Sequence, residues 1–192
     1  MEKESIYTIP NFLSFYRLIM FPVVLYFAIT EDINLFTIFF VINLLTDVLD
    51  GFIARMFNQQ TRLGARLDSL ADVGSFVLAF VGVFIFRWDN VQPHAISFFT
   101  FLGLYLLTDV FALLKFKKIS SFHLYSWKVC GYVQGIFFIV LFAIDFYEPF
   151  YYLMIVFSIL AAIEHLIIQI IIKDMKSNLK GLYWVLKERN NG

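Results

Sequence analysis

Six apolar stretches of this chain are each long enough to cross a lipid bilayer, and they constrain its fold more than any other feature. They cover residues 12–29, 33–49, 70–86, 94–114, 129–146 and 150–172. Hydrophobic residues make up 60% of the chain, which excludes a disordered or ordinary soluble protein. Because backbone amides in lipid must be paired within their own segment, we predict an all-α integral membrane protein with six transmembrane helices. No linker divides the chain, so residues 1–192 are expected to form a single domain.

Charged residues are distributed unevenly between the predicted spans. Basic residues gather near the N-terminus, in alternate loops and in the C-terminal tail, namely Lys3, Arg17, Arg55, Arg62, Arg66, Lys115, Lys117, Lys118, Lys128, Lys173, Lys176, Lys180, Lys187 and Arg189. The other loops hold Arg87, Glu31, Asp32, Asp89, Asp145 and Glu148. Because cytoplasmic loops are enriched in Lys and Arg, we predict a multi-pass protein of the cell (inner) membrane with both N and C termini in the cytoplasm.

The segments outside the spans are short. The N-terminal one precedes residue 12, and the C-terminal tail has an amphipathic pattern. Its apolar residues recur at helical spacing beside basic ones: Leu179, Leu182, Tyr183 and Leu186 beside Lys180, Lys187 and Arg189. This pattern is typical of a helix in the headgroup region, so we predict a C-terminal interfacial segment. A solvated tail is the alternative interpretation.

Four aspartates lie at the predicted cytoplasmic ends of the second and third spans, where an ionised carboxylate near hydrocarbon is costly. Asp47 and Asp50 are three residues apart, so they lie on adjoining faces of one helix. Asp68 and Asp72 are four apart and stack on one face of the next. The polar residues 58–61 are poor helix formers and allow the chain to reverse. We therefore expect the four carboxylates to converge.

Converging carboxylates favour a hard divalent cation. Ligation by oxygen alone selects Mg²⁺ or Mn²⁺, and it also suits Ca²⁺. No Cys or His lies near the aspartates, which argues against zinc, and Cys130 is the single cysteine of the chain. The sequence therefore predicts a site for Mg²⁺ or Mn²⁺, and four carboxylates can serve two ions.

Small residues accompany the aspartates. Gly51, Ala54 and Gly64 stand where bulky residues would be ordinary, so a phosphate or a flat ligand can approach the helix backbone closely. Arg55 is placed to clamp such a phosphate. Two alternatives stay open: small residues in membrane helices often mediate helix packing, and Arg55 also fits contact with lipid headgroups.

The complete pattern, D-V-L-D-G-F-I-A-R and then, eight residues later, G-A-R-L-D-S-L-A-D, resembles the signature of the CDP-alcohol phosphatidyltransferases. That signature reads Asp-x2-Asp-Gly-x2-Ala-Arg-x8-Gly-x3-Asp-x3-Asp, and the chain matches every fixed position from Asp47 to Asp72. The opening I-P-N-F-L-S-F-Y-R is similar to the Pro-Asn-x-Leu-Ser/Thr-x2-Arg start of bacterial members. The resemblance extends over the whole chain in its six-span plan.

This resemblance implies transfer of a phosphatidyl group from CDP-diacylglycerol to a small polar alcohol, with release of CMP, in phospholipid biosynthesis. It implies that Asp47, Asp50 and Asp68 bind the metal ions, and that Asp72 also ligates one and acts as the catalytic base. It further implies that the nucleotide and its phosphates are bound by Asp50, Gly51, Ala54, Arg55, Gly64 and Asp68. Family members commonly form homodimers in the bilayer, so a homodimer is expected, and no nucleic-acid partner is expected.

The sequence indicates the acceptor alcohol less clearly than it indicates the donor. The segment around Lys128 resembles the Gly-Lys-x2-Thr-x2-Gln segment of bacterial phosphatidylglycerophosphate synthases, although Trp127 replaces its Gly and Gly131 its Thr. Glycerol 3-phosphate is therefore the expected acceptor, with inositol, inositol phosphate or serine as alternatives. A phosphorylated acceptor needs cations, for which Lys128, Arg17 and Arg66 are the candidates. An equally good interpretation is that the Arg17 side chain extends to the lipid headgroups.

The spans contain other ionisable residues, for which the sequence allows more than one role. Asp109, Glu164 and His165 are candidates for an acceptor pocket or a proton relay. Equally, Asp109 fits a structural pair with Lys128, and Glu164 a pair with a neighbouring cation. Two further functions also place carboxylates in membrane helices. They are an intramembrane prenyltransferase that binds its diphosphate through magnesium, and a cation transporter.

Overall fold

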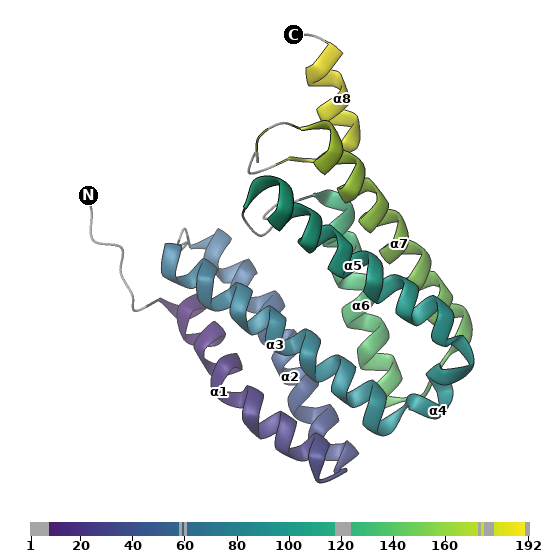
Figure 1. The fold of residues 1–192 in the computed structure, drawn as a ribbon. Coiled ribbons are helices and arrows are strands. Elements are labelled where there is room, and N and C mark those ends of the chain that lie inside the picture. The colour runs from purple at the N-terminus through teal and green to yellow at the C-terminus, as the bar shows by residue number, and fades with distance from the viewer. Residues whose placement is uncertain are drawn as a thin grey trace. The chain divides into compact units, whose positions relative to one another are not determined.

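The computed structural model describes residues 8–57, 59, 61–117, 124–172, 174 and 179–190. They form α1 (Ile9–Ile29), α2 (Ile33–Met56), α3 (Arg62–Phe86), α4 (Trp88–Val91), the 3-10 helix η1 (Gln92–His94), α5 (Ala95–Phe116), α6 (Tyr125–Ala143), α7 (Glu148–Ile171) and α8 (Leu182–Asn190) (Figure 1). No strand occurs among these residues. Six helical segments are long and apolar enough to cross a membrane, so the prediction of an all-α, six-span membrane protein is confirmed.

The helices that carry the aspartates are longer than the apolar stretches that predicted them. α2 continues beyond its predicted end to Met56, and α3 already begins at Arg62. Hydropathy detects only the part of a helix that lies in lipid, whereas backbone hydrogen bonds and caps extend the helix into polar surroundings. The aspartate motif therefore lies on two helices joined by a short loop. Asn58 and Gln60 of this loop lie outside the described residues.

Some basic residues of the predicted charge asymmetry also lie outside the described residues. They are Lys3, Lys118, Lys173 and Lys176, together with the side chains of Arg62 and Arg189. The orientation of the termini stays a prediction. The six apolar helices nevertheless define a multi-pass membrane protein.

The chain divides into two compact units. The first comprises Met1–Asp89 and Leu141–Asp145, and the second comprises Asn90–Val140 and Phe146–Gly192. In the first unit, α1 lies beside both α2 and α3 (Figure 1). In the second, α5 packs against α7, and α7 contacts α8. The expected single domain stays a prediction.

Aromatic rings fill the core of the first unit. Phe36 and Phe40 are fully buried, and their ring centroids lie 5.2 and 5.5 Å from that of Phe142. These edge-to-face arrangements are favourable for aromatic pairs. Gly82 of α3 makes room for them, because a Cβ there would lie 2.6 Å from Cζ of Phe36 and 2.8 Å from Cζ of Phe142. The core therefore fixes α3 closely against α2.

Buried polar side chains join the helices of the second unit. Gln134 of α6 donates hydrogen bonds to the hydroxyl of Tyr105 on α5 at 2.7 Å and to that of Ser158 on α7 at 2.9 Å. The Cys130 sulfur lies 3.4 Å from each of these hydroxyls. Interhelical hydrogen bonds of this kind stabilise helix packing in membranes. Gln134 is therefore a packing residue of this unit.

α8 is held at its start by α7. The backbone N–H of Leu182 donates to Oε1 of Glu164 at 2.8 Å, which satisfies one of the free amides of a helix N-terminus.

The prediction that the apolar residues of the tail share one helical face is wrong in part. Leu179 and Val185 are buried in a cluster that Leu182 also contacts, whereas the other aromatic and aliphatic residues, Tyr183, Trp184 and Leu186, are exposed. Leu179 precedes the helix, so helical spacing does not place it on the same face. The interfacial location stays a prediction.

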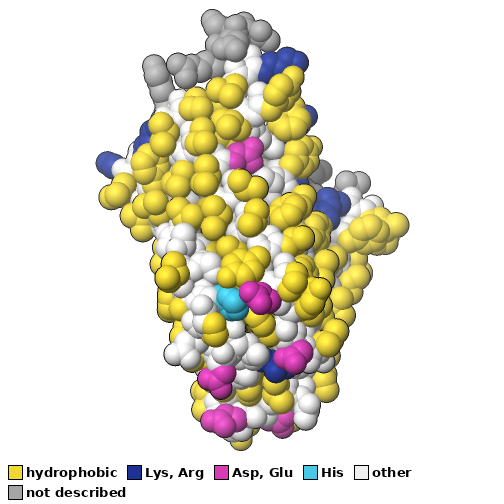
Figure 2. Space-filling view, turned by 90° about the vertical axis from the view of Figure 1, so that its right-hand side faces the viewer, with side chains coloured by type: hydrophobic (Ala, Val, Ile, Leu, Met, Phe, Trp, Pro, Cys, Tyr) yellow, Lys and Arg dark blue, Asp and Glu magenta, His cyan; other side chains and the backbone are white. Residues whose placement is uncertain are grey.

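The surface of the spans is strongly apolar. Figure 2 shows a face on which hydrophobic side chains cover most of the middle. One helix, α7, exposes Val156, Leu160, Ile163, Ile167 and Ile170. A continuous apolar surface of this kind is unfavourable in water and fits contact with lipid tails.

Candidate functional site

The aspartates of α2 and α3 meet inside the first unit, as their spacing predicts. Asp47, Asp50 and Asp68 each offer one carboxylate oxygen, and these oxygens all lie within 4.8 Å of one another. The Asp50 side chain is 6% exposed, whereas those of Asp47 and Asp68 are 38% and 43% exposed. The cluster thus has a buried side and an open side. An all-oxygen donor set of this kind fits a hard divalent cation.

Arg17 of α1 lies in the middle of these carboxylates. Its Nη1 is 2.6 Å from Oδ1 of Asp47 and 3.3 Å from Oδ1 of Asp68. Its Nη2 is 2.7 Å from Oδ1 of Asp72, and Oδ2 of Asp50 lies 3.7 Å from Nη1. The Arg17 side chain is only 2% exposed. The alternative in which Arg17 extends to the lipid headgroups is therefore wrong, and Asp72 is connected to the other aspartates through this arginine.

The opening motif supplies further polar contacts from the same face of α1. Asn11, Ser14 and Arg17 are three residues apart in turn and all are buried. The Ser14 hydroxyl donates to Oδ2 of Asp50 at 3.0 Å. The Thr61 hydroxyl donates to Oδ1 of Asn11 at 3.0 Å, at the N-cap of α3. This face of α1 therefore anchors both helices that carry the aspartates.

The two glycines of the motif have different surroundings. A Cβ added at Gly64 would overlap Oδ1 of Asn11 and would lie 2.9 Å from Oγ1 of Thr61. Close packing of α1 on α3 therefore explains Gly64. A Cβ added at Gly51 would meet only the Arg55 guanidinium, at 3.6 Å, which is an ordinary contact distance. Helix packing thus does not explain Gly51.

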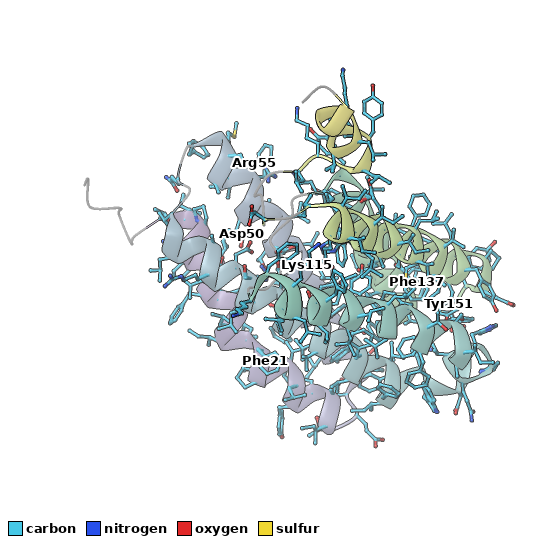
Figure 3. All side chains as sticks on the ribbon, turned by 45° about the horizontal axis from the view of Figure 1, so that its top comes forward. Phe21, Asp50, Arg55, Lys115, Phe137 and Tyr151 are labelled. Atoms are coloured by element: carbon cyan, nitrogen blue, oxygen red, sulfur yellow. The ribbon has the colours of Figure 1, made fainter. Side chains whose placement is uncertain are left out.

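The remaining predicted residues of the first unit, Ala54, Arg55 and Arg66, are not buried. Asp50 and Arg55 lie near the same end of α2 (Figure 3), and the Arg55 side chain is exposed. Ala54 is half-buried beside it, and Arg66 is exposed on α3. The exposed Arg55 guanidinium thus lies beside Gly51, next to Asp50 in the chain, which suits an anionic ligand.

Lys128, the predicted acceptor ligand, belongs to the second unit. It is exposed on α6, and its Nζ lies 5.7 Å from the centroid of the Tyr125 ring. Asp109 is exposed on α5, and among the residues that the structure describes no ion pair joins it to Lys128. The role of Lys128 stays a prediction.

Glu164 and His165 have structural contacts in the second unit. Glu164 accepts a hydrogen bond from the start of α8, as described above. The buried His165 ring packs edge-to-face on Trp127 at 5.2 Å, and its Nε2 lies 3.1 Å from Nε2 of Gln169. Glu164 therefore caps α8, and no ion pair joins it to a cation among the described residues. The contacts of His165 fit a packing role.

The chain belongs to the CDP-alcohol phosphatidyltransferase family, whose sequence model matches residues 7–171. It is 38% identical to the CDP-diacylglycerol--glycerol-3-phosphate 3-phosphatidyltransferase of Aquifex aeolicus over 95 residues, which cover 50% of the chain and 52% of the relative. The Escherichia coli protein of the same name is 37% identical over 78 residues, 39% of the chain and 43% of the relative.

Another relative carries a different name. The human cardiolipin synthase (CMP-forming) is 50% identical over 70 residues, which cover 36% of the chain and 23% of that protein. The chain thus spans about half the length, or less, of the curated relatives that it matches. No solved structure matches the chain.

Proposed function

We propose that this protein transfers a phosphatidyl group from CDP-diacylglycerol to the hydroxyl group of glycerol 3-phosphate and releases CMP. The observation that carries this proposal is the convergence of Asp47, Asp50 and Asp68 in a chain of this family. The names of the Aquifex aeolicus and Escherichia coli relatives support the acceptor. We further propose that the site faces the cytoplasm and that the protein forms a homodimer.

The proposed cofactor of the aspartate cluster is two divalent ions, Mg²⁺ or Mn²⁺. Asp47, Asp50 and Asp68 would hold them. Asp72 pairs with Arg17, which also contacts these aspartates. When bound, the metal would neutralise the diphosphate of the donor and stabilise the departing CMP. The donor set supports this choice, because all of its ligands are carboxylate oxygens.

The nucleotide is proposed to bind at the open end of the cluster. Gly51 leaves the surface of α2 accessible beneath Arg55, and the Arg55 guanidinium can donate two parallel hydrogen bonds to a phosphate. The backbone at Gly51 and Ala54 would contact the cytidine and ribose, with Asp50 and Asp68 beside it, whereas Gly64 would serve the packing of α1 on α3. Arg55 would also orient the donor so that its lipid-bearing phosphorus faces the acceptor.

Asp72 is the proposed general base. Its side chain is 46% exposed, and Arg17 pairs with its Oδ1 atom. Oδ2 can therefore accept the proton of the acceptor hydroxyl while that oxygen attacks the phosphorus. The new P–O bond forms as the bond to CMP breaks, so the negative charge leaves with CMP and the proton stays on Asp72.

A second candidate function is the synthesis of cardiolipin with release of CMP, because the human relative bears that name. Its acceptor would be the hydroxyl group of a second phospholipid, phosphatidylglycerol. An acceptor panel distinguishes the two candidates. Purified protein with CDP-diacylglycerol and Mg²⁺ or Mn²⁺ is offered glycerol 3-phosphate, phosphatidylglycerol, inositol, inositol phosphate or serine, and CMP and the lipid product are measured. We expect CMP release with glycerol 3-phosphate.

Two separate experiments could contradict the proposal. Turnover of a prenyl diphosphate without any CMP release would indicate a prenyltransferase. Divalent-metal flux in proteoliposomes without nucleotide affinity would indicate a transporter.

Gly51→Ala and Gly64→Ala should separate nucleotide binding from helix packing. Gly51→Ala has room for its Cβ, so we expect unchanged thermal stability and a KM for CDP-diacylglycerol raised about tenfold. Gly64→Ala should instead destabilise the protein by about 1–3 kcal/mol, because its Cβ overlaps Asn11. Thermal unfolding and initial rates check both expectations. An unchanged KM in Gly51→Ala would remove Gly51 from the nucleotide site.

Lys128→Ala tests the acceptor assignment. If Lys128 binds the phosphate of glycerol 3-phosphate, its loss should raise KM for this acceptor about tenfold and leave KM for CDP-diacylglycerol unchanged. Lys187→Ala, which removes an exposed lysine of α8, is the matched control. Initial rates with each substrate varied in turn give both constants. An effect confined to CDP-diacylglycerol would show that Lys128 does not bind the acceptor.

A further inference from the structure

Arg17 is the buried cation of the aspartate cluster, and its position has a consequence for metal binding. We propose that Arg17 is an internal counter-ion that competes with the divalent cation for Asp47 and Asp68. It thereby lowers the affinity of the cluster for metal and holds α1, α2 and α3 together when no metal is bound. This inference rests on the metal dependence proposed above.

The charges of the cluster require a counter-ion. Four acidic side chains surround one guanidinium, with N–O distances from 2.6 to 3.7 Å, so the acidic groups outnumber the cation that pairs with them. Arginine keeps its proton in proteins, and burial of its side chain is costly unless it is paired. Without Arg17 the carboxylates would repel one another at close range. The arginine and the aspartates therefore stabilise each other.

A single guanidinium connects three helices. Its Nη1 donates to Asp47 on α2 and to Asp68 on α3, and its Nη2 donates to Asp72 on α3. Its own backbone belongs to α1. Loss of Arg17 would therefore remove a contact from each of the three helices and add repulsion between α2 and α3.

Arg17 and a metal ion require the same carboxylates. Asp47 and Asp68 are two of the three residues whose oxygens lie within 4.8 Å of one another, and Nη1 contacts Oδ1 of both. A divalent ion held by these oxygens would lie a few ångströms from the guanidinium, where like charges repel strongly. Metal binding must therefore displace Nη1 or overcome this repulsion. In either case, the arginine lowers metal affinity.

The structure also offers a place for the displaced guanidinium. Nη2 donates to Asp72 at 2.7 Å and to the hydroxyl of Ser75 at 3.4 Å. Neither residue belongs to the group of three carboxylates that lie closest together. A small movement of the side chain toward Asp72 and Ser75 would free Asp47 and Asp68 while it keeps the arginine paired.

Mn²⁺ binding to purified protein in detergent tests the inference without any substrate. Calorimetric titration gives the Kd for Mn²⁺, and thermal unfolding gives Tm in chelator and in saturating Mn²⁺. We expect Arg17→Gln to lower the Kd about tenfold, because a positive charge next to the ion is removed. Its Tm in chelator should fall, and Mn²⁺ should raise Tm by more than in the unaltered protein. Arg17→Lys keeps the charge, so its Kd should stay close to the unaltered value.

Two further variants control for a general loss of structure. Arg87→Gln removes an arginine from another ion pair of the same unit, with Asp145 at 3.5 Å, and should change neither the Kd nor the Mn²⁺-induced rise in Tm. The double variant Arg17→Gln with Asp72→Asn restores the net charge of the cluster. We expect it to regain part of the Tm in chelator, even if Arg17→Gln alone folds only with Mn²⁺. A double variant less stable in chelator than Arg17→Gln would overturn the inference.

The outcomes separate this inference from the proposed function. If the unaltered protein binds Mn²⁺ and Arg17→Gln binds it equally or more weakly, Arg17 does not compete with metal, and the proposed function stands. If the unaltered protein binds no Mn²⁺, the proposed metal site itself is wrong, and the competition fails with it.

Discussion

Asp50→Asn is expected to reduce phosphatidyl transfer at least about a thousandfold, because the change removes the most buried charge of the proposed metal site. Asparagine has nearly the same shape and can still accept the hydrogen bond that Ser14 donates to Asp50. The fold should therefore persist while the site loses a negative ligand. CMP release from CDP-diacylglycerol and Mn²⁺ titration of the same preparation measure the two effects together.

Asp145→Asn is the matched control for this prediction. Asp145 belongs to the same unit, is largely exposed and pairs with Arg87, so its replacement should leave transfer and Mn²⁺ affinity unchanged. If Asp50→Asn kept full activity, the aspartate cluster would not be the metal site. If it lost activity but bound Mn²⁺ as before, Asp50 would act on the nucleotide and not on the metal.

Asp72→Asn is expected to lower kcat by about a hundredfold to ten-thousandfold while binding of CDP-diacylglycerol and Mn²⁺ changes little. The amide oxygen can still accept the hydrogen bond from Arg17, so the packing of α1 on α3 should survive. Only the capacity to take up the proton of the acceptor would be lost. Single-turnover rates, together with equilibrium binding of each ligand, separate the chemical step from binding.

The same variant also decides between the two roles given to Asp72. Unchanged turnover would remove it from the role of base. Loss of Mn²⁺ binding alongside turnover would show that Asp72 serves mainly as a metal ligand. Ser69→Ala on the same helix, where the serine hydroxyl donates to the backbone carbonyl of Ala65 at 2.8 Å, is a suitable control.

The sequence predicted the aspartate cluster because helical periodicity and the position of a loop are enough to define it. Asp47 and Asp50 on one helix and Asp68 on the next must approach one another once the chain reverses between them, and the structure brings them together. The six spans were predictable for a similar reason, since hydropathy and length follow from the thickness of a bilayer.

The central position of Arg17 was not predictable in the same way. Its spacing from Asn11 and Ser14 indicates a shared face of α1, but spacing within one helix does not show which neighbour that face contacts. Polar residues at helical spacing in an otherwise apolar span were the available signal. Packing against α2 and α3 then decides that this face points into the aspartate cluster.

Contacts between helices also account for two residues of the second unit whose roles are not evident from the sequence. A carboxylate such as Glu164 has the same pattern whether it binds a cation or caps a helix, and only the start of α8 beside it makes it a cap. Likewise, Gln134 occupies a position of the segment that resembles an acceptor motif, yet its amide bonds to Tyr105 and Ser158. The partner that a polar side chain contacts depends on distances between helices, which spacing along the sequence does not give.

The position of Arg17 on the first helix also matters for how the protein is made. The ribosome produces the chain from its N-terminus, so α1 is complete before the aspartates of α2 and α3 have been synthesised. The cation on α1 is therefore synthesised before the aspartates with which it pairs in the folded protein. Phe142, which completes the aromatic core around Phe36, is synthesised only after α4, α5 and most of α6. The order of translation thus supplies the neutralising arginine before the acids that need it.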